Sequence, residues 1–333
     1  MLPSHPNTQT PRGGGPTVLD VYQARRRIGN RVLQTPLRPS SWLSSITGAH
    51  VQLKIESANL TGSFKIRGAF NAALRLKEDT VGASRVVVTA SAGNHGRALA
   101  MATEQLGLTC VVFTPVTAPD AKKHAIRRHG AILHADCIDY DAAEQQAREF
   151  AEAEGAVYIS PYNHVDVIAG AGTIGLEIVE TLPRVDAVVV PLGGGGLASG
   201  VGLALKAVVP NVTVIGVEVE ASAPFTISLE AGGITEITPQ PSLADGLVGN
   251  LEKGSMTFPL VRQVVDRVVT VSEADLGRAM KGLASEERLI AEGAGAATVA
   301  AIVAGKASAP GQHVVAIVTG ANVDLPKWLL TVS

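Results

Sequence analysis

Residues 187–197 read Ala-Val-Val-Val-Pro-Leu-Gly-Gly-Gly-Gly-Leu. A short apolar run that ends in four successive glycines is typical of a buried strand followed by a loop and a helix. Glycines let the backbone bend sharply and leave several N–H groups uncovered. Such N–H groups, together with the positive end of the helix dipole, bind an anion. The stretch therefore predicts an α/β fold with a phosphate site at this turn, and a tight turn that serves packing alone is the alternative.

The same alternation of short apolar runs and alanine-rich helical patterns extends over most of the chain. Strands are expected at 51–55, 85–89, 109–113, 131–134, 157–159, 187–192, 213–218, 267–271 and 313–318. Helices are expected at 63–76, 94–105, 141–154, 167–181 and 273–288. Near-continuous apolar strands separated by helices favour parallel sheets covered on both faces, as one sheet or as two. Ligands of such sheets bind beyond the carboxyl ends of the strands.

Composition limits the classes of function. Of 333 residues, 46% are hydrophobic and 17% charged, which excludes a disordered chain. The 28 basic and 30 acidic residues leave a net charge of −2, without the basic surplus that nucleic acid requires. Two cysteines are too few for a disulfide framework. No apolar leader opens the chain, and four glycines interrupt the longest uncharged stretch, so we expect a cytoplasmic protein that does not enter a membrane.

The phosphate could belong to a dinucleotide. Gly193, Gly195 and Ala198 match the permissive spacing of the dinucleotide fingerprint, and Glu218 ends the next strand about twenty residues later. A dinucleotide turn normally opens a domain, whereas here much of the sheet precedes it. An NAD-binding oxidoreductase is therefore the alternative from a different class.

A lysine turn favours another cofactor. Lys65 follows Gly62-Ser63-Phe64 and is expected in the first turn of a helix, where the dipole is positive and lowers the pKa of an ammonium group. A lowered pKa suits a lysine that forms an imine or removes a proton. A solvated surface lysine is the alternative. Combined with the glycine loop, the lysine indicates pyridoxal 5'-phosphate.

At this point the chain resembles a known family. Residues 61–69, Thr-Gly-Ser-Phe-Lys-Ile-Arg-Gly-Ala, look like the pyridoxal-lysine motif of the serine/threonine dehydratases, which are fold-type II enzymes similar to tryptophan synthase β. The resemblance continues in family order through 91–96, 167–173, the glycine loop, 244–246 and 319–322.

The resemblance implies two three-layer α/β/α domains with mainly parallel sheets and the cofactor between them. A disordered tail would span 1–16, and a large cofactor-binding domain would combine 17–52 with 155–333. A small domain would be inserted at 53–154. Relatives are commonly homodimers or tetramers.

The resemblance also assigns site residues. Lys65 would hold the cofactor and later remove the Cα proton of a small amino-acid substrate. The expected cofactor contacts are Phe64 and Gly246 at the ring faces, Asn94 at the phenolic oxygen, Thr319 at the ring nitrogen, and Gly193, Gly194, Gly195, Gly196 and Leu197 at the phosphate. The expected substrate-carboxylate contacts are Ser63, Ser91, Ala92, Asn94 and His95.

The implied activity is elimination of water from a β-hydroxy amino acid of the threonine or serine type. An uncharged Thr319 leaves the ring a weaker electron sink than an aspartate would, which favours prompt loss of a leaving group. Serine racemases carry a serine at the position of Ala92, so racemisation is the less favoured alternative. A bulkier substrate such as phenylserine and a non-catalytic pyridoxal-binding protein stay open.

Some relatives bind a divalent cation next to the strand that ends at Glu218. Glu218 is present, but the acidic partner expected nearby is replaced in the stretch 220–224, Glu-Ala-Ser-Ala-Pro. A hard cation needs several oxygen ligands. We therefore expect no metal, with Glu218 as the one candidate ligand.

Overall fold

The computed structural model describes residues 15–79, 86–91 and 93–333. Nearly all of the expected tail, residue 85 of one expected strand and Ala92 lie outside these ranges. Two sheets organise the described chain, one of six strands in the order β1-β2-β10-β7-β8-β9 and one of four in the order β5-β4-β3-β6. The strands are β1 (Leu37–Pro39), β2 (His50–Ile55), β3 (Val86–Ala90), β4 (Thr109–Pro115), β5 (Ile132–Cys137), β6 (Val157–Tyr158), β7 (Ala187–Pro191), β8 (Thr213–Val219), β9 (Arg267–Val271) and β10 (His313–Val318).

Helices connect and cover these strands. They are α1 (Val18–Ile28), α2 (Ser41–Thr47), α3 (Lys65–Asp79), α4 (Asn94–Leu106), α5 (Asp120–Arg127), α6 (Tyr140–Glu154), α7 (Val165–Thr181), α8 (Gly196–Val208), α9 (Pro224–Ala231), α10 (Thr257–Val264), α11 (Glu273–Ser285), α12 (Gly293–Val303) and α13 (Leu325–Val332), with short 3₁₀ turns η1 (Gly29–Arg31), η2 (Glu56–Ala58) and η3 (Asp245–Leu247). None of the helices in the described ranges combines the length and the apolar character needed to cross a lipid bilayer.

The strand prediction is confirmed, with one addition. All nine expected strands form, within a few residues of the expected ends. Every neighbouring pair is parallel except β1 and β2. The sequence pattern missed β1 because it has three residues, one of them Pro39, and no apolar run. Proline cannot donate to a ladder, and β1 accordingly lies at the edge of its sheet.

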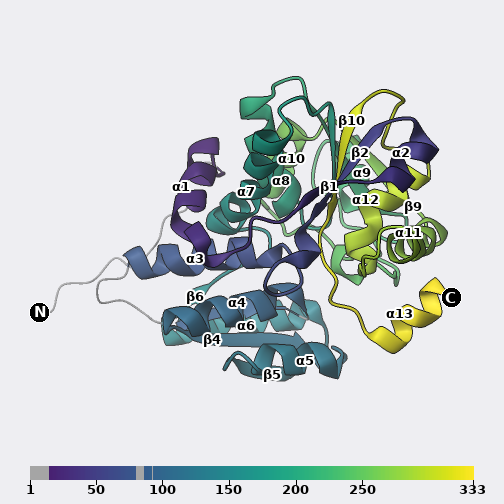
Figure 1. The fold of residues 1–333 in the computed structure, drawn as a ribbon. Coiled ribbons are helices and arrows are strands. Elements are labelled where there is room, and N and C mark those ends of the chain that lie inside the picture. The colour runs from purple at the N-terminus through teal and green to yellow at the C-terminus, as the bar shows by residue number, and fades with distance from the viewer. Residues whose placement is uncertain (1–14, 80–85, 92) are drawn as a thin grey trace, which may run out of the picture.

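Each sheet forms the middle of three layers. In β7, Ala187 and Val189 face one core, with α12, while Val188 and Val190 face the other, with α7 and α8. In the four-stranded sheet, β3 and β4 turn one face to α3 and α4 and the opposite face to α6. Figure 1 shows the smaller sheet and its helices in blue below the larger one, with α3 between them. Helix α3 packs against both α4 and α7.

Strand pairing also shows where the chain passes between the sheets. Strand β2 pairs with β10 over its whole length, from His50 to Ile55. Strand β6 pairs with β3 in the smaller sheet. Strand β2 thus belongs to the larger sheet and β6 to the smaller one, while the domain division into 17–52 plus 155–333 and 53–154 stays a prediction. Hydrophobic periodicity marks a strand but does not say which sheet it joins.

Candidate active site

The glycine loop, the lysine turn and the Thr319 turn meet at the carboxyl ends of strands in the larger sheet. Strands β7 and β10 are parallel neighbours, so the glycine loop after β7 and Thr319 after β10 emerge on the same side. The lysine turn is bonded to this side. The N–H of Phe64 donates to the Thr319 carbonyl at 3.0 Å, and the N–H of Ala321 donates to the Gly62 carbonyl at 2.9 Å. Two segments 255 residues apart in sequence (64 and 319) are thus held together by main-chain bonds.

The glycine loop needs its glycines. Gly195 has φ +84°, a left-handed conformation that other residues rarely adopt, and an added Cβ would lie 2.6 Å from the Phe225 ring. A Cβ on Gly194 would overlap the ring of Tyr162. The loop leads directly into α8, which begins at Gly196. This confirms a bare backbone cradle at a helix N-terminus, the arrangement that binds anions.

Gly246 and Leu197 lie beside this cradle. A Cβ on Gly193 would lie 3.2 Å from the Leu247 Cα and 3.4 Å from the Gly246 carbonyl oxygen. Leu197 is buried in the first turn of α8. A Cβ on Gly246 would in turn lie 3.3 Å from Ala294, whose carbonyl accepts the Thr319 hydroxyl at 3.3 Å. Residues expected at the phosphate, at one ring face and at the ring nitrogen therefore lie next to one another.

Lys65 opens α3 within this surface. Its Nζ donates to the Pro161 carbonyl at 2.8 Å and lies 5.2 Å from the centre of the Phe64 ring. Burial lowers the pKa of Lys65 to about 8, against the opposing charge of Glu292. The lowered pKa agrees with the sequence expectation, but its main cause is desolvation rather than the helix dipole alone. An amine with this pKa is about one-tenth neutral at pH 7, far more than an ordinary lysine.

Three of the expected carboxylate contacts, Ser91, Asn94 and His95, lie at the N-terminus of α4. The Ser91 hydroxyl accepts from the N–H groups of Gly93 at 3.2 Å and Gly96 at 2.9 Å, which fixes the turn into the helix. Ser63 is fully buried and its hydroxyl has no hydrogen-bond partner among the described residues. Neither ring nitrogen of the buried His95 makes a hydrogen bond of normal geometry in that part of the chain, and the backbone of Ile159 interacts with the ring and opposes the fall of its pKa. Burial, then the charge of Lys65, lowers the pKa of His95 to about 3, so the ring is neutral.

Buried polar atoms without partners normally mark a position that a ligand or water completes. Ser63 and His95 supply such atoms beside a bare glycine cradle and a lysine of lowered pKa. These residues fit a phosphate-bearing aldehyde cofactor together with an amino-acid carboxylate.

The sequence reasoning did not identify Glu292 and Asn322 as functional candidates, although both bond to the side chain of Asn94. Asn94 donates from Nδ2 to Glu292 Oε1 at 2.6 Å and accepts at Oδ1 from Asn322 Nδ2 at 2.7 Å. Glu292 is buried, and burial followed by the charge of Asp245 raises its pKa to about 7. One signal was available for Glu292: it is the acid that precedes the uncharged helix α12, with Gly293 and Gly295 in its first turn.

Glu218, the one candidate metal ligand, is already hydrogen-bonded within the protein. The Glu218 carboxylate accepts from the N–H of Phe225 at 2.7 Å and from the N–H and hydroxyl of Thr226 at 2.8 and 2.6 Å. Both oxygens therefore face donors at the start of α9. No group of three or more potential metal-ligating side chains occurs within the described ranges. The same bonds occupy the acid that a dinucleotide ribose would need.

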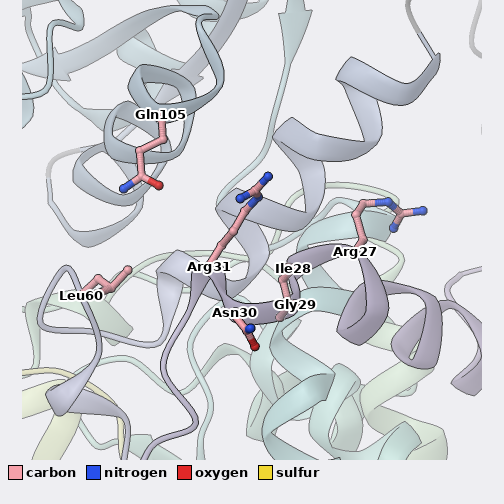
Figure 2. Close-up of a pocket in the computed structure, with 7 residues that line it drawn as sticks. All are labelled: Arg27, Ile28, Gly29, Asn30, Arg31, Leu60 and Gln105. Carbon is pink, nitrogen blue, oxygen red and sulfur yellow. The ribbon is translucent and has the colours of Figure 1, made fainter.

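A surface cavity lies apart from this site. Figure 2 shows it at the end of α1, with none of the proposed site residues in its lining. The lining residues are Arg27, Ile28, Gly29, Asn30, Arg31, Leu60 and Gln105. Arg27 is already bonded to Glu78 at 2.9 Å and to Asn71 at 2.8 Å.

Comparison with known proteins agrees with this geometry. A family model described as pyridoxal-phosphate dependent enzyme matches residues 28–320. An L-threonine ammonia-lyase of Thermotoga maritima is 41% identical over 93% of this chain and 76% of its own length. A catabolic L-threonine dehydratase of Escherichia coli is 38% identical over 92% of this chain and 93% of its own.

Among solved structures, a maize serine racemase has a TM-score of 0.89 at 32% identity, covering 95% of this chain and 97% of that one. The match across 28–320 contains the lysine turn, the glycine loop and Thr319. The dinucleotide alternative is therefore wrong, and the chain belongs to the pyridoxal-phosphate-dependent enzyme family, among its threonine dehydratase and serine racemase relatives of fold type II.

Proposed function

We propose that this chain is an ammonia-lyase that converts L-threonine or L-serine to a 2-oxo acid and ammonia. The observation that carries the proposal is the position of Lys65. Its Nζ, with a pKa of about 8, donates to the carbonyl of Pro161, the residue before the Tyr162 ring that covers Gly194. The neighbouring Phe64 is bonded through its N–H to Thr319. The names of the two threonine-specific relatives support the reaction type.

The residues already described would hold pyridoxal phosphate. Its ring system, when bound, withdraws electrons from Cα of an attached amino acid and so acidifies the Cα–H bond. Lys65 would bind the cofactor's aldehyde carbon. The remaining contacts are main-chain N–H groups of Gly193, Gly194, Gly195, Gly196 and Leu197 at the phosphate, Phe64 and Gly246 at the ring faces, Asn94 at the phenolic oxygen, and Thr319 at the ring nitrogen.

Once the amino group of the substrate has replaced it at the cofactor's aldehyde carbon, Lys65 would be free to act as the base of the elimination. Its neutral Nζ takes the Cα proton, the electron pair forms the Cα–Cβ double bond, and the Cβ–O bond breaks. The departing hydroxyl gains one proton, which balances the proton that Lys65 removes from Cα, and leaves as water. The released enamine tautomerises and adds water, so that ammonia departs and a 2-oxo acid remains. Water is lost once and added once, so the net products are the 2-oxo acid and ammonia.

The substrate carboxylate would lie at the N-terminus of α4. Helix N-termini attract anions, and the partnerless Ser63 hydroxyl and His95 ring border this position. Ser91 supports the turn, with Ala92 and Asn94 on either side of Gly93. No proton-transferring side chain exists at Ala92, which favours elimination over racemisation.

Racemisation is the second candidate, because the fold is so similar to that of a maize serine racemase. A bulkier substrate such as phenylserine belongs to the same chemistry, and a non-catalytic pyridoxal-binding protein is the remaining class. We further propose a cytoplasmic homodimer or tetramer without a catalytic metal, in which the four-stranded unit is a small domain inserted in the large one.

A substrate panel tests the proposal. The purified protein should absorb visible light through its lysine-bound cofactor and form a 2-oxo acid from L-threonine and L-serine. Ammonia should appear in equal amount. Coloured protein that forms no 2-oxo acid from L-threonine, L-serine or phenylserine would overturn the lyase assignment, and D-serine as the main product from L-serine would favour racemisation.

A further inference from the structure

Glu292 is the one acid that contacts a proposed cofactor residue within the described part of the chain. It lies 8% exposed at the N-terminus of α12, and its Oε1 accepts from Asn94 Nδ2 at 2.6 Å. Its own position is fixed on the other side. The Glu292 N–H donates to the Gly320 carbonyl at 3.1 Å, and a Cβ on Gly320 would overlap the carboxylate.

The other end of the Asn94 amide is held as well. Asn94 Oδ1 accepts from Asn322 Nδ2 at 2.7 Å. Asn322 is itself oriented, because Nδ2 also donates to the Thr61 carbonyl at 2.8 Å and Oδ1 accepts from Arg97 at 2.6 Å. Its amide therefore presents N–H groups, not oxygen, to Asn94.

These partners leave the Asn94 amide one orientation. A rotation by 180° would place its oxygen against the Glu292 carboxylate and its NH₂ group against the NH₂ group of Asn322. The contact between the two NH₂ groups would be repulsive, and so would the contact of the oxygen with an ionised Glu292. An amide carries two N–H donors, and Glu292 uses one of them. The second is left to donate elsewhere.

We propose that Glu292 is a positioning residue: it fixes the Asn94 amide so that the remaining N–H points to the phenolic oxygen of the cofactor. The inference rests on the proposed cofactor site. Glu292 touches neither substrate nor cofactor in this role and acts through Asn94. Its chemistry requires an acceptor at Oε1, which both a carboxylate and a neutral amide provide.

A double-mutant cycle on cofactor binding separates positioning from a direct effect. Apo-protein is titrated with pyridoxal 5'-phosphate, and the dissociation constant is read from the visible absorbance of the bound form. Glu292→Ala should weaken binding about tenfold, because the Asn94 amide loses the acceptor that orients it. In an Asn94→Ala background the same substitution should change the constant less than about twofold. Equal weakening in both backgrounds, or none in the first, overturns the proposal.

Two further variants keep the test interpretable. Glu292→Gln preserves an acceptor for Asn94 and should bind the cofactor within about threefold of the parent, with an unshifted absorbance maximum. Tenfold weakening in this variant would show that charge and not orientation matters, which also overturns the proposal. Glu287 is the matched control: it is equally buried at 8% but bonded to Ser40 and Arg38, so Glu287→Gln should leave cofactor affinity unchanged.

The cycle is independent of turnover. A protein that binds the cofactor but forms no 2-oxo acid would overturn the proposed function and leave the cycle readable. If the effects of the two substitutions on the cofactor dissociation constant are additive in a protein with normal turnover, only the positioning role is overturned.

Discussion

Helix α3 contributes to two buried charged groups that are arranged in opposite ways. Arg67 belongs to a four-charge cluster with Lys54, Glu56 and Glu177, in which Arg67 bonds Glu56 at 2.8 Å and Glu177 at 2.6 Å, and Lys54 bonds Glu177 at 2.5 Å. Lys65, two residues earlier, has one carbonyl as its hydrogen-bond acceptor and Glu292 only as a distant charge.

The pKa values differ accordingly. In the four-charge cluster, burial opposes the charged forms, but Glu56 and Glu177 raise the pKa of Arg67, and Arg67 and Lys54 lower that of Glu56. Lys54 is the exception in this cluster, because burial lowers its pKa against the charges of Glu56 and Glu177. In the active site, burial prevails: the pKa of Lys65 falls to about 8, that of His95 falls to about 3 and that of Glu292 rises to about 7. Full pairing holds charge where it supports the fold, and incomplete pairing leaves groups close to neutrality where protons must move.

The strongest test of this contrast removes the unpaired lysine. Lys65→Met should lower turnover at least about 10³-fold, because no other side chain replaces the base. The free energy of unfolding of the apo-protein should fall by less than about 1 kcal/mol, since no ion pair is broken. A 2-oxo acid assay and urea unfolding measure the two effects. Lys77→Met, on the same helix with its Nζ on the Leu106 carbonyl, is the control and should keep full turnover. A large loss of stability with residual turnover would break the contrast.

Removal of the paired arginine should have the opposite outcome. Arg67→Met leaves Glu56 and Glu177 buried with too little positive charge, and should lower the free energy of unfolding by about 3–5 kcal/mol. The matched control is Arg25→Met, which breaks an exposed pair with Glu180 and should cost less than about 1 kcal/mol. Similar unfolding midpoints for the two variants would show that the buried cluster does not hold the fold.

The pH dependence of the rate at which Lys65 reacts with the cofactor's aldehyde tests the lowered pKa of this lysine directly. A neutral amine is needed to attack the cofactor's aldehyde carbon, and the neutral fraction of Lys65 rises as pH increases through about 8. Stopped-flow absorbance should therefore show the capture rate rising about tenfold per pH unit below 8 and levelling above it. A rate that still rises steeply between pH 9 and about 10 would mean that burial does not lower the pKa of Lys65.

Much of this contrast could be read in the sequence, and part of it could not. The strand-to-helix turns identified the glycine loop, Lys65 and Thr319 because glycine runs and a lysine after Gly62 are local signals. Glu292 and Asn322 act through side chains from distant segments, and only the topology brings Asn322 to Asn94. The hydrogen bonds of Glu218 could not be predicted for a similar reason: its partners, Phe225 and Thr226, contribute main-chain and hydroxyl donors that have no sequence signature.

A smaller effect concerns the stability of the apo-protein. The folded state keeps the proton of Glu292 up to about pH 7, whereas the unfolded chain releases it near 4.5. The stability that this proton provides is complete below about 4.5 and is lost as pH rises through 7. The wild type should therefore lose stability relative to Glu292→Gln by up to about 1.4 kcal/mol per pH unit in this window. The groups that face Glu292 are Asn94, Asp245, Lys122 and Lys65, and they are common to both proteins. A stability difference that is independent of pH would contradict the raised pKa.

The smallest expected effect is a gain of racemase activity, through a proton donor on the side of the substrate Cα opposite Lys65. Racemisation needs a proton donor on the side of Cα opposite Lys65, and the sequence places Ala92, which carries no such group, where related racemases have serine. Ala92→Ser should therefore produce D-serine from L-serine while pyruvate formation stays dominant, as chiral chromatography of both products would show. Ala92→Gly, which also lacks a hydroxyl, is the control and should form no D-serine. If neither variant differs from the parent, a proton donor at this position does not decide between elimination and racemisation. The contrast between incompletely and fully paired groups would then not explain the choice of reaction.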